Sequence, residues 1–147
     1  MTRSLVREHL FKLLFRIEFN SPEDMPEQVS LYFEDSIADE DLKSTGADIP
    51  EEDAIYIRDK YDKIVSLLSE IDAKIDEAAN GWRVERIGKV ELAILRLAVY
   101  EMKYDDDIPV GVAIDEAVEL AKRFGPDSSA SFINGILASL SKESSNE

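Results

Sequence analysis

The sequence predicts an all-α protein of six or seven helices joined by short connections. Apolar residues recur at steps of three and four through most of the chain, which places them on one face of a helix. No segment alternates between apolar and polar residues with the two-residue period of a half-buried strand. Short stretches that contain proline, glycine or asparagine separate the periodic segments, as expected of turns between helices.

The length and composition of the chain fit one domain with a packed core. The chain has 147 residues, of which 44% are hydrophobic, and it has no cysteine. We expect a single domain over residues 1–147, with a first half at 1–80, a second half at 81–141 and a frayed tail at 142–147. No uncharged apolar run reaches about 18 residues, so no membrane span is expected. The absence of cysteine fits a reducing compartment, which we take to be the cytoplasm.

The first half contains three predicted helices. The second of these follows a turn, with Ser21 as its N-cap and Pro22 in the first helical position. Residues 38–49 are acidic and are predicted to form a loop. The third helix opens at Pro50 and continues until Asn80-Gly81 stops it. The first helix has one apolar face, formed by Val6, Leu10, Leu13, Leu14 and Ile17.

The second half contains three further predicted helices. Residues 82–103 are apolar nearly all round, which predicts a central helix that is buried on most sides. Arg96 lies within this apolar segment, so we expect it to have a structural partner. The next helix is predicted over residues 110–124 and ends at Gly125-Pro126, with the glycine in the left-handed conformation. Ser128 or Ser129 can serve as the N-cap of the last helix.

The net charge of −15 is concentrated in the middle of the chain. Residues 1–20 carry +2, whereas residues 21–80 combine 5 basic and 18 acidic groups for a net charge of −13. The total argues against nucleic-acid binding, because polyphosphate attracts positive surface. The division leaves a small basic segment at the N-terminus. The acidic segment is either a solvated surface that keeps the protein soluble or a docking surface for a basic partner.

No set of residues assembles a catalytic or metal site, so the sequence predicts neither an enzyme nor a cofactor. His9 is the only histidine, and no carboxylate is placed to orient it as a general base, so we expect it at the surface. Gly88-Lys89 lacks the spacing of a phosphate loop, and the aspartates at 105–107 lack the glycine and ligands of a calcium loop.

The first helix combines cations with aromatic rings. Arg7, Phe11 and Phe15 fall on one stripe of the helix, and Arg3 leads into that stripe. A second basic edge is formed by Lys12 and Arg16. Guanidinium groups hold phosphate in a fork and rings stack on unpaired bases, so the helix has the chemistry of a single-stranded RNA surface. Alternatively, the two phenylalanines widen the core face and the arginines lie at its solvent edge.

Three segments of the second half form a longer pattern. They are residues 90–102 (VELAILRLAVYEM), 107–125 (DIPVGVAIDEAVELAKRFG) and 129–137 (SASFINGIL). This pattern resembles the NusB family of bacterial transcription antitermination factors. The resemblance covers essentially the whole chain, and it is strong over residues 82–137 and weak over residues 21–80. It implies two small helical bundles packed together and a non-catalytic role.

The resemblance also implies partners and site residues. NusB-like proteins pair with a small-subunit ribosomal protein, known in transcription as NusE, and bind boxA RNA of nascent ribosomal transcripts in the RNA polymerase antitermination complex. The RNA-binding residues then fall on Arg3, Arg7, Lys12, Phe15, Arg16, Lys122, Ser128 and Phe132. The NusE-docking surface includes Glu85 and Glu91, since acidic groups suit a basic ribosomal protein. Exposed apolar residues on the first helix also leave a homodimer open.

Two functional hypotheses therefore stand. In the first, the chain is an RNA-binding antitermination subunit that works with NusE. In the second, it is an acidic helical adaptor that binds only protein. Four clustered cations supply few phosphate contacts, and the acidic middle segment opposes them. The first hypothesis thus predicts weak RNA binding alone and tighter binding with NusE.

Overall fold

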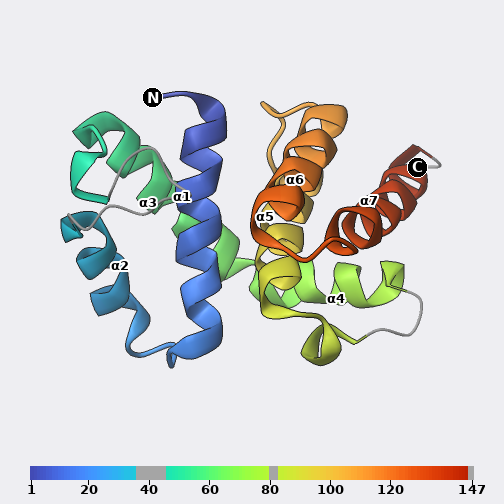
Figure 1. The fold of residues 1–147 in the computed structure, drawn as a ribbon, viewed down its shortest axis with the longest axis horizontal. Helices are drawn as coiled ribbons and strands as arrows, with labels where there is room; N and C mark the ends of the chain where they lie inside the picture. The colour runs from blue at the N-terminus through green and yellow to red at the C-terminus, as the bar shows by residue number, and fades with distance from the viewer. Residues whose placement is uncertain (36–45, 80–82, 146–147) are drawn as a thin grey trace. The chain divides into compact units, whose positions relative to one another are not determined.

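The computed structural model describes residues 1–35, 46–79 and 83–145 (Figure 1). Within these residues the chain forms seven α-helices and three short 3-10 helices, and no strand, which confirms the predicted all-α class. None of the helices in the described part is long and apolar enough to cross a membrane. The chain divides into two compact units, Met1–Ser66 and Leu67–Glu147.

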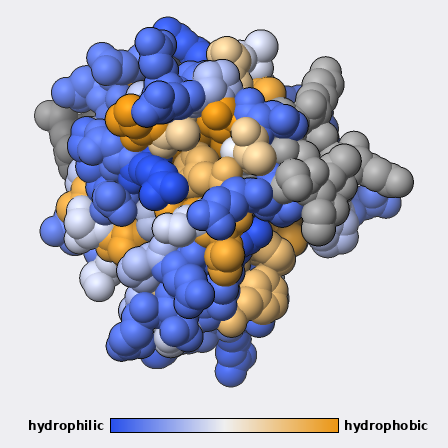
Figure 2. Space-filling model, turned by 90° about the vertical axis from the view of Figure 1, so that its left-hand side faces the viewer, coloured by the Kyte–Doolittle hydropathy of each residue, from blue (hydrophilic) through white to orange (hydrophobic). Residues whose placement is uncertain are grey.

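The first unit is built around α1 (Arg3–Arg16). The helices α2 (Met25–Glu34) and α3 (Glu51–Ser66) both pack against α1, and the 3-10 helices η1 (Ile17–Phe19) and η2 (Gly46–Asp48) complete the unit. Its fully buried hydrophobic side chains come from the predicted apolar stripes of α1 and α3: Leu10, Leu13, Leu14, Ile57 and Ile64. On the side where α2 and α3 lie, hydrophobic residues are interspersed with hydrophilic ones (Figure 2).

The second unit is built around α5 (Lys89–Tyr104). This helix packs against α4 (Leu68–Ala78), α6 (Val110–Phe124) and α7 (Ser129–Ser145), and α6 and α7 pack against each other. Every residue from 92 to 101 is buried, which confirms the prediction of a central helix covered on most sides. The fully buried side chains of the unit include Ile71, Ile75, Ile94, Leu95, Leu97, Ile133 and Leu137.

The boundary between the units lies between Ser66 and Leu67, earlier than the Asn80-Gly81 boundary that the sequence suggested. The predicted third helix is in fact two helices, because α3 ends at Ser66 and α4 begins at Leu68. Since α4 packs against α5 and α7, it belongs to the second unit. Residues 36–45 and 80–82, which include most of the predicted acidic loop and the Asn80-Gly81 stop, lie outside the described residues.

Two predicted helix starts were wrong. The α2 helix begins at Met25, with Pro26 in its first turn. Ser21 instead closes a preceding turn, because its hydroxyl donates to Asp24 Oδ2 at 2.9 Å. The central helix begins at Lys89, since the segment before it forms the separate 3-10 helix η3 (Val84–Arg86).

The predicted left-handed cap at Gly125 was also wrong. Gly125 has φ of −101° and ψ of 168°, which is extended backbone that other residues can adopt. The position has little room for a side chain instead. A Cβ atom there would lie 2.7 Å from Ser129 Oγ and 3.1 Å from the carbonyl oxygen of Ala121. Glycine at this position therefore lets the start of α7 approach the end of α6.

Candidate nucleic-acid interface

The predicted cations of α1 differ in exposure. The helix is capped by Thr2, whose Oγ1 accepts a hydrogen bond from the Leu5 amide at 3.1 Å. Arg3 follows the cap directly and is exposed, whereas Lys12 is half-buried. Arg7 is only 4% exposed. Arg3 is therefore accessible from solvent, whereas Arg7 is covered by the rest of the protein.

Arg16 connects α1 to α2 within the first unit. Its Nη1 donates to the main-chain oxygen of Gln28 at 3.3 Å and to the Gln28 side-chain oxygen at 3.4 Å. Its guanidinium also lies 5.0 Å from the centroid of the Tyr32 ring, in a cation–π contact. Any phosphate contact of Arg16 is thus shared with a structural role that its position in the sequence did not reveal.

Three phenylalanines follow one another along α1 and η1. The ring centroids of Phe11 and Phe15 are 6.1 Å apart, and those of Phe15 and Phe19 are 4.9 Å apart at an interplanar angle of 70°. Phe11 is 3% exposed, Phe15 is half-buried and Phe19 is 58% exposed. The core interpretation therefore holds for Phe11. The series, which we call the phenylalanine ladder, leads from the core to the surface.

The prediction that His9 lies at the surface was wrong. His9 is fully buried, and its Nδ1 lies 2.5 Å from the Tyr32 hydroxyl oxygen in a hydrogen bond. Burial, and more weakly the positive charge of Lys12, lowers the pKa of His9 to about 4. The sequence offered no carboxylate to orient His9, but in the structure the Tyr32 hydroxyl of α2 is its hydrogen-bond partner. His9 is a structural residue of the first unit.

The remaining predicted RNA residues surround the connection between α6 and α7. Lys122 is exposed near the end of α6 and pairs with Glu119 at 3.4 Å. Ser128 is exposed and directly precedes α7, and Phe132 lies half-buried in the first turn of that helix. The Ser129 hydroxyl donates to Glu91 Oε1, which attaches the start of α7 to α5. The second unit therefore presents a cation, a hydroxyl and a ring on firmly held backbone.

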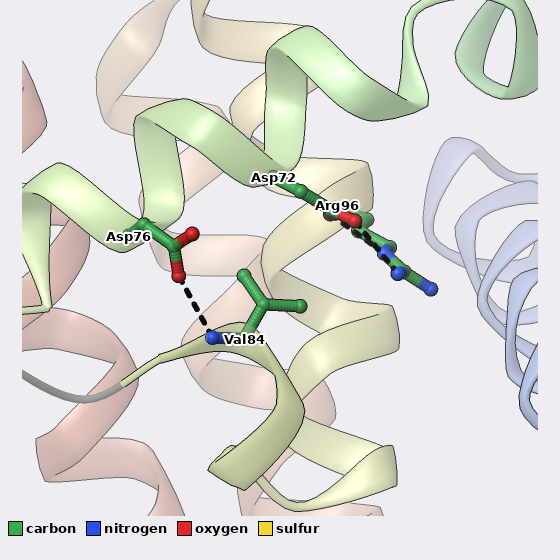
Figure 3. Close-up of polar contacts among 4 residues, drawn as sticks. All are labelled: Asp72, Asp76, Val84 and Arg96. Atoms are coloured by element: carbon green, nitrogen blue, oxygen red, sulfur yellow. Dashed lines mark hydrogen bonds and ion pairs between the residues drawn. The ribbon is translucent and has the colours of Figure 1, made fainter.

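The two predicted partner-binding carboxylates have different surroundings. Glu85 is exposed on η3. This short helix is held by α4, because Asp76 Oδ1 accepts a hydrogen bond from the Val84 amide at 2.8 Å (Figure 3). Glu91 is half-buried, and its carboxylate holds Ser129. Glu85 is thus available to a partner, whereas Glu91 already stabilises the second unit.

Comparison with known proteins places this architecture in a family. A sequence model of the NusB family matches residues 4–142. The chain belongs to the NusB family. It is 50% identical over 138 residues to the transcription antitermination protein NusB of Lachnoclostridium phytofermentans, covering 94% of this chain and 97% of that protein. The structure of NusB from T. maritima matches with a TM-score of 0.79 and 35% identity, covering 97% of this chain and 92% of that chain.

A further NusB-family structure supports the fold. This is the crystal structure of antitermination factors NusB and NusE in complex with dsRNA, which matches with a TM-score of 0.72 and 24% identity over 96% of each chain. The NusB family consists of transcription antitermination factors and is not known for catalysis. The resemblance to this family, predicted for essentially the whole chain, is thereby confirmed over residues 4–142.

Two residues of related chemistry lie beside the predicted ones in this NusB-family chain. Phe19 ends the phenylalanine ladder and is the most exposed of its three rings. Arg123 is exposed next to Lys122, with its guanidinium 5.0 Å from the centroid of the Phe124 ring. The sequence contained a signal for both. Phe19 continues the four-residue spacing of Phe11 and Phe15, and Arg123 doubles the charge at the end of α6.

Proposed function

We propose that this chain is a non-catalytic transcription antitermination factor of the cytoplasm. It binds boxA-type RNA of nascent ribosomal transcripts together with the ribosomal protein NusE, as part of the RNA polymerase antitermination complex. The observation that carries this proposal is the 50% identity, over nearly the full length of both chains, to a transcription antitermination protein. The fold shared with a NusB chain crystallised with NusE and dsRNA supports NusE and RNA as partner classes.

The charge distribution supports RNA binding that depends on a partner. Arg3 and Lys122 are exposed cations, one in each unit, whereas Arg7 is buried and Arg16 is engaged by Gln28 and Tyr32. Few of the predicted RNA-binding cations are therefore exposed to phosphate, and the chain as a whole carries −15. We expect weak RNA affinity from the chain alone and a gain when basic NusE contributes its own cations.

One exposed carboxylate is a candidate contact for the basic partner. Glu85 stands exposed on η3, and the Asp76 contact to the Val84 amide fixes that short helix. A carboxylate on a held backbone attracts a cationic protein without a large entropic cost of ordering. We therefore assign Glu85 to the NusE-docking surface. Glu91 contributes indirectly, because its contact with Ser129 holds α7 against α5.

A binding titration tests the proposal. A labelled boxA RNA is titrated with the chain, with and without NusE, at two salt concentrations. We expect the affinity to rise at least tenfold with NusE and to fall steeply with salt, because phosphate contacts release counterions. Equal and weak binding with and without NusE would instead favour a purely protein-binding adaptor. A boxA RNA with scrambled sequence serves as the control for specificity.

A further inference from the structure

The phenylalanine ladder ends in a ring that faces solvent. Phe19 is 58% exposed on η1, directly after α1. Its ring makes an edge contact with Phe15, with centroids 4.9 Å apart and planes inclined by 70°. Phe15 in turn contacts Phe11, which is 3% exposed and belongs to the core. The exposed ring is therefore supported by two others rather than standing alone.

The backbone under Phe19 is also held. The Asn20 side-chain amide donates to the main-chain oxygen of Arg16 at 2.9 Å, and the Ile17 amide bonds to the carbonyl oxygens of Leu14 and Phe15. These contacts close the turn that carries the ring. A ring on ordered backbone loses little conformational freedom when a ligand covers it, so its exposed area is well suited to binding.

We propose that Phe19 is the residue of the first unit on which an unpaired RNA base stacks, and that Phe15 supports it. This inference rests on the proposed RNA-binding function and assigns the stacking role to a ring other than Phe15. Base stacking needs exposed ring surface and tolerates any base, because every base has a π-face. Phe15 is half-buried between its two neighbours, whereas most of Phe19 is accessible.

The charged neighbours of Phe19 favour RNA over a purely apolar ligand. Lys12 precedes Phe19 by seven residues, about two helical turns earlier. Arg16 is closer in sequence, but its guanidinium already contacts Gln28 and Tyr32. A ring that follows a cation within about two helical turns fits a nucleotide, since the phosphate and the base can be bound together. An isolated exposed phenylalanine is common on proteins, but support by a ladder, with a cation in the preceding helix, is a more specific arrangement.

Paired substitutions separate stacking from simple apolar contact. Phe19→Leu keeps an apolar side chain and removes the π-face, whereas Phe19→Tyr keeps the ring. We expect Phe19→Leu to weaken boxA RNA binding in the presence of NusE by about tenfold, and Phe19→Tyr to stay within about twofold. The matched control is Tyr56→Leu, which removes a 48% exposed ring from α3 of the same unit and should leave RNA affinity unchanged.

A spectroscopic readout tests contact directly. The chain has one tryptophan, so Phe19→Trp adds a second emitter whose signal is obtained by comparison with the wild type. Stacking predicts that boxA RNA quenches this added emission in the presence of NusE. Equal RNA affinity for Phe19→Leu and wild type, or an added emission that RNA does not change, would overturn the Phe19 assignment.

Further outcomes distinguish failure of the Phe19 assignment from failure of the proposed function. If Phe19→Leu weakened the association with NusE measured without RNA, the ring would contact protein and the stacking assignment would be wrong. If the Phe19 variants matched wild type while RNA binding still depended on NusE, the proposed function would stand without this inference. Failure of the wild type itself to bind boxA RNA with NusE would overturn both.

Discussion

Arg96 on α5 and Asp72 on α4 meet through two parallel hydrogen bonds, Nε to Oδ1 and Nη2 to Oδ2, each of 2.9 Å (Figure 3). The side chain of Arg96 is 8% exposed, so the pair is largely removed from solvent on the arginine side. This two-point contact matches the planar fork of the guanidinium to a carboxylate. It attaches α4 to the central helix and helps to explain why α4 belongs to the second unit.

Removal of Asp72 should destabilise the protein. Asp72→Ala leaves the Arg96 guanidinium buried without this carboxylate, so we expect the free energy of unfolding to fall by about 3 kcal/mol. Chemical denaturation measures the change. The control is Asp59→Ala, which breaks the exposed pair with Lys63 on α3 and should cost less than about 1 kcal/mol. An equal loss in the free energy of unfolding for the two variants would show that the buried pair stabilises the protein no more than the exposed pair does.

Two glycines should respond in opposite directions to alanine. At Gly125 the added methyl group meets Ser129 Oγ at 2.7 Å, and we expect a loss of stability of about 1–3 kcal/mol. Gly135 lies exposed within α7, with nothing within 4 Å of an added Cβ. Gly135→Ala should therefore raise stability by about 0.5–1 kcal/mol. Thermal unfolding of the two variants tests both predictions. A Gly125→Ala variant that is more stable than wild type would contradict the close approach of α7 to the end of α6.

Buried His9 should make stability depend on pH. Its pKa of about 4 in the folded state lies below the unfolded value of 6.5, so the folded state resists protonation. The contribution of neutral His9 is fully present above pH 6.5 and is lost as the pH falls from 6.5 towards 4. The shift corresponds to about 3 kcal/mol.

Denaturation curves at pH 7 and pH 4.5 measure this effect. His9→Gln keeps a polar side chain but cannot take up the proton. The drop in the free energy of unfolding between the two pH values should therefore be smaller in the variant by about 2–3 kcal/mol. Subtracting the variant cancels the carboxylates that titrate in the same range. An identical drop in both proteins would show that His9 is not shielded from protonation.

Substitution of the two predicted partner-binding carboxylates should have different effects, on NusE binding for Glu85 and on stability for Glu91. Glu85→Ala should weaken NusE association several-fold and leave the melting temperature unchanged, because Glu85 is an exposed charge on a held turn. Glu91→Ala should lower stability by about 1–3 kcal/mol, because buried Ser129 loses its acceptor. Calorimetry and thermal unfolding of both variants provide the test. A destabilised Glu85→Ala would refute the division of roles.

The helices could be predicted where the apolar period was uninterrupted. The central helix and α6 followed from residues 92–101 and 110–124 because burial imposes that period on the sequence. The break at Leu67 could not be predicted, since no glycine or proline stands there. The chain separates α3 from α4 because each packs in a different unit, which is a tertiary effect.

The sequence predicted which residue types lie on the candidate RNA surface, but not which of them are exposed. The sequence indicated cations and rings on α1, but α2 determines which of them are covered. Tyr32 of α2 contacts both His9 and Arg16, through a hydrogen bond and a cation–π contact. These contacts give two residues of the basic segment a structural role. Sequence spacing could place Arg96 in an apolar segment, but could not choose Asp72 among the many acidic residues upstream.

The most direct test of the antitermination role is terminator read-through in a reconstituted transcription reaction. The template carries boxA upstream of a terminator, and this chain and NusE are added singly and together. We expect read-through to rise only when both proteins are present and boxA is intact. The gain should shrink in Lys122→Ala, because a phosphate contact is lost. Read-through that is unchanged by this chain, or that is equal on a template with mutated boxA, would contradict the proposed function.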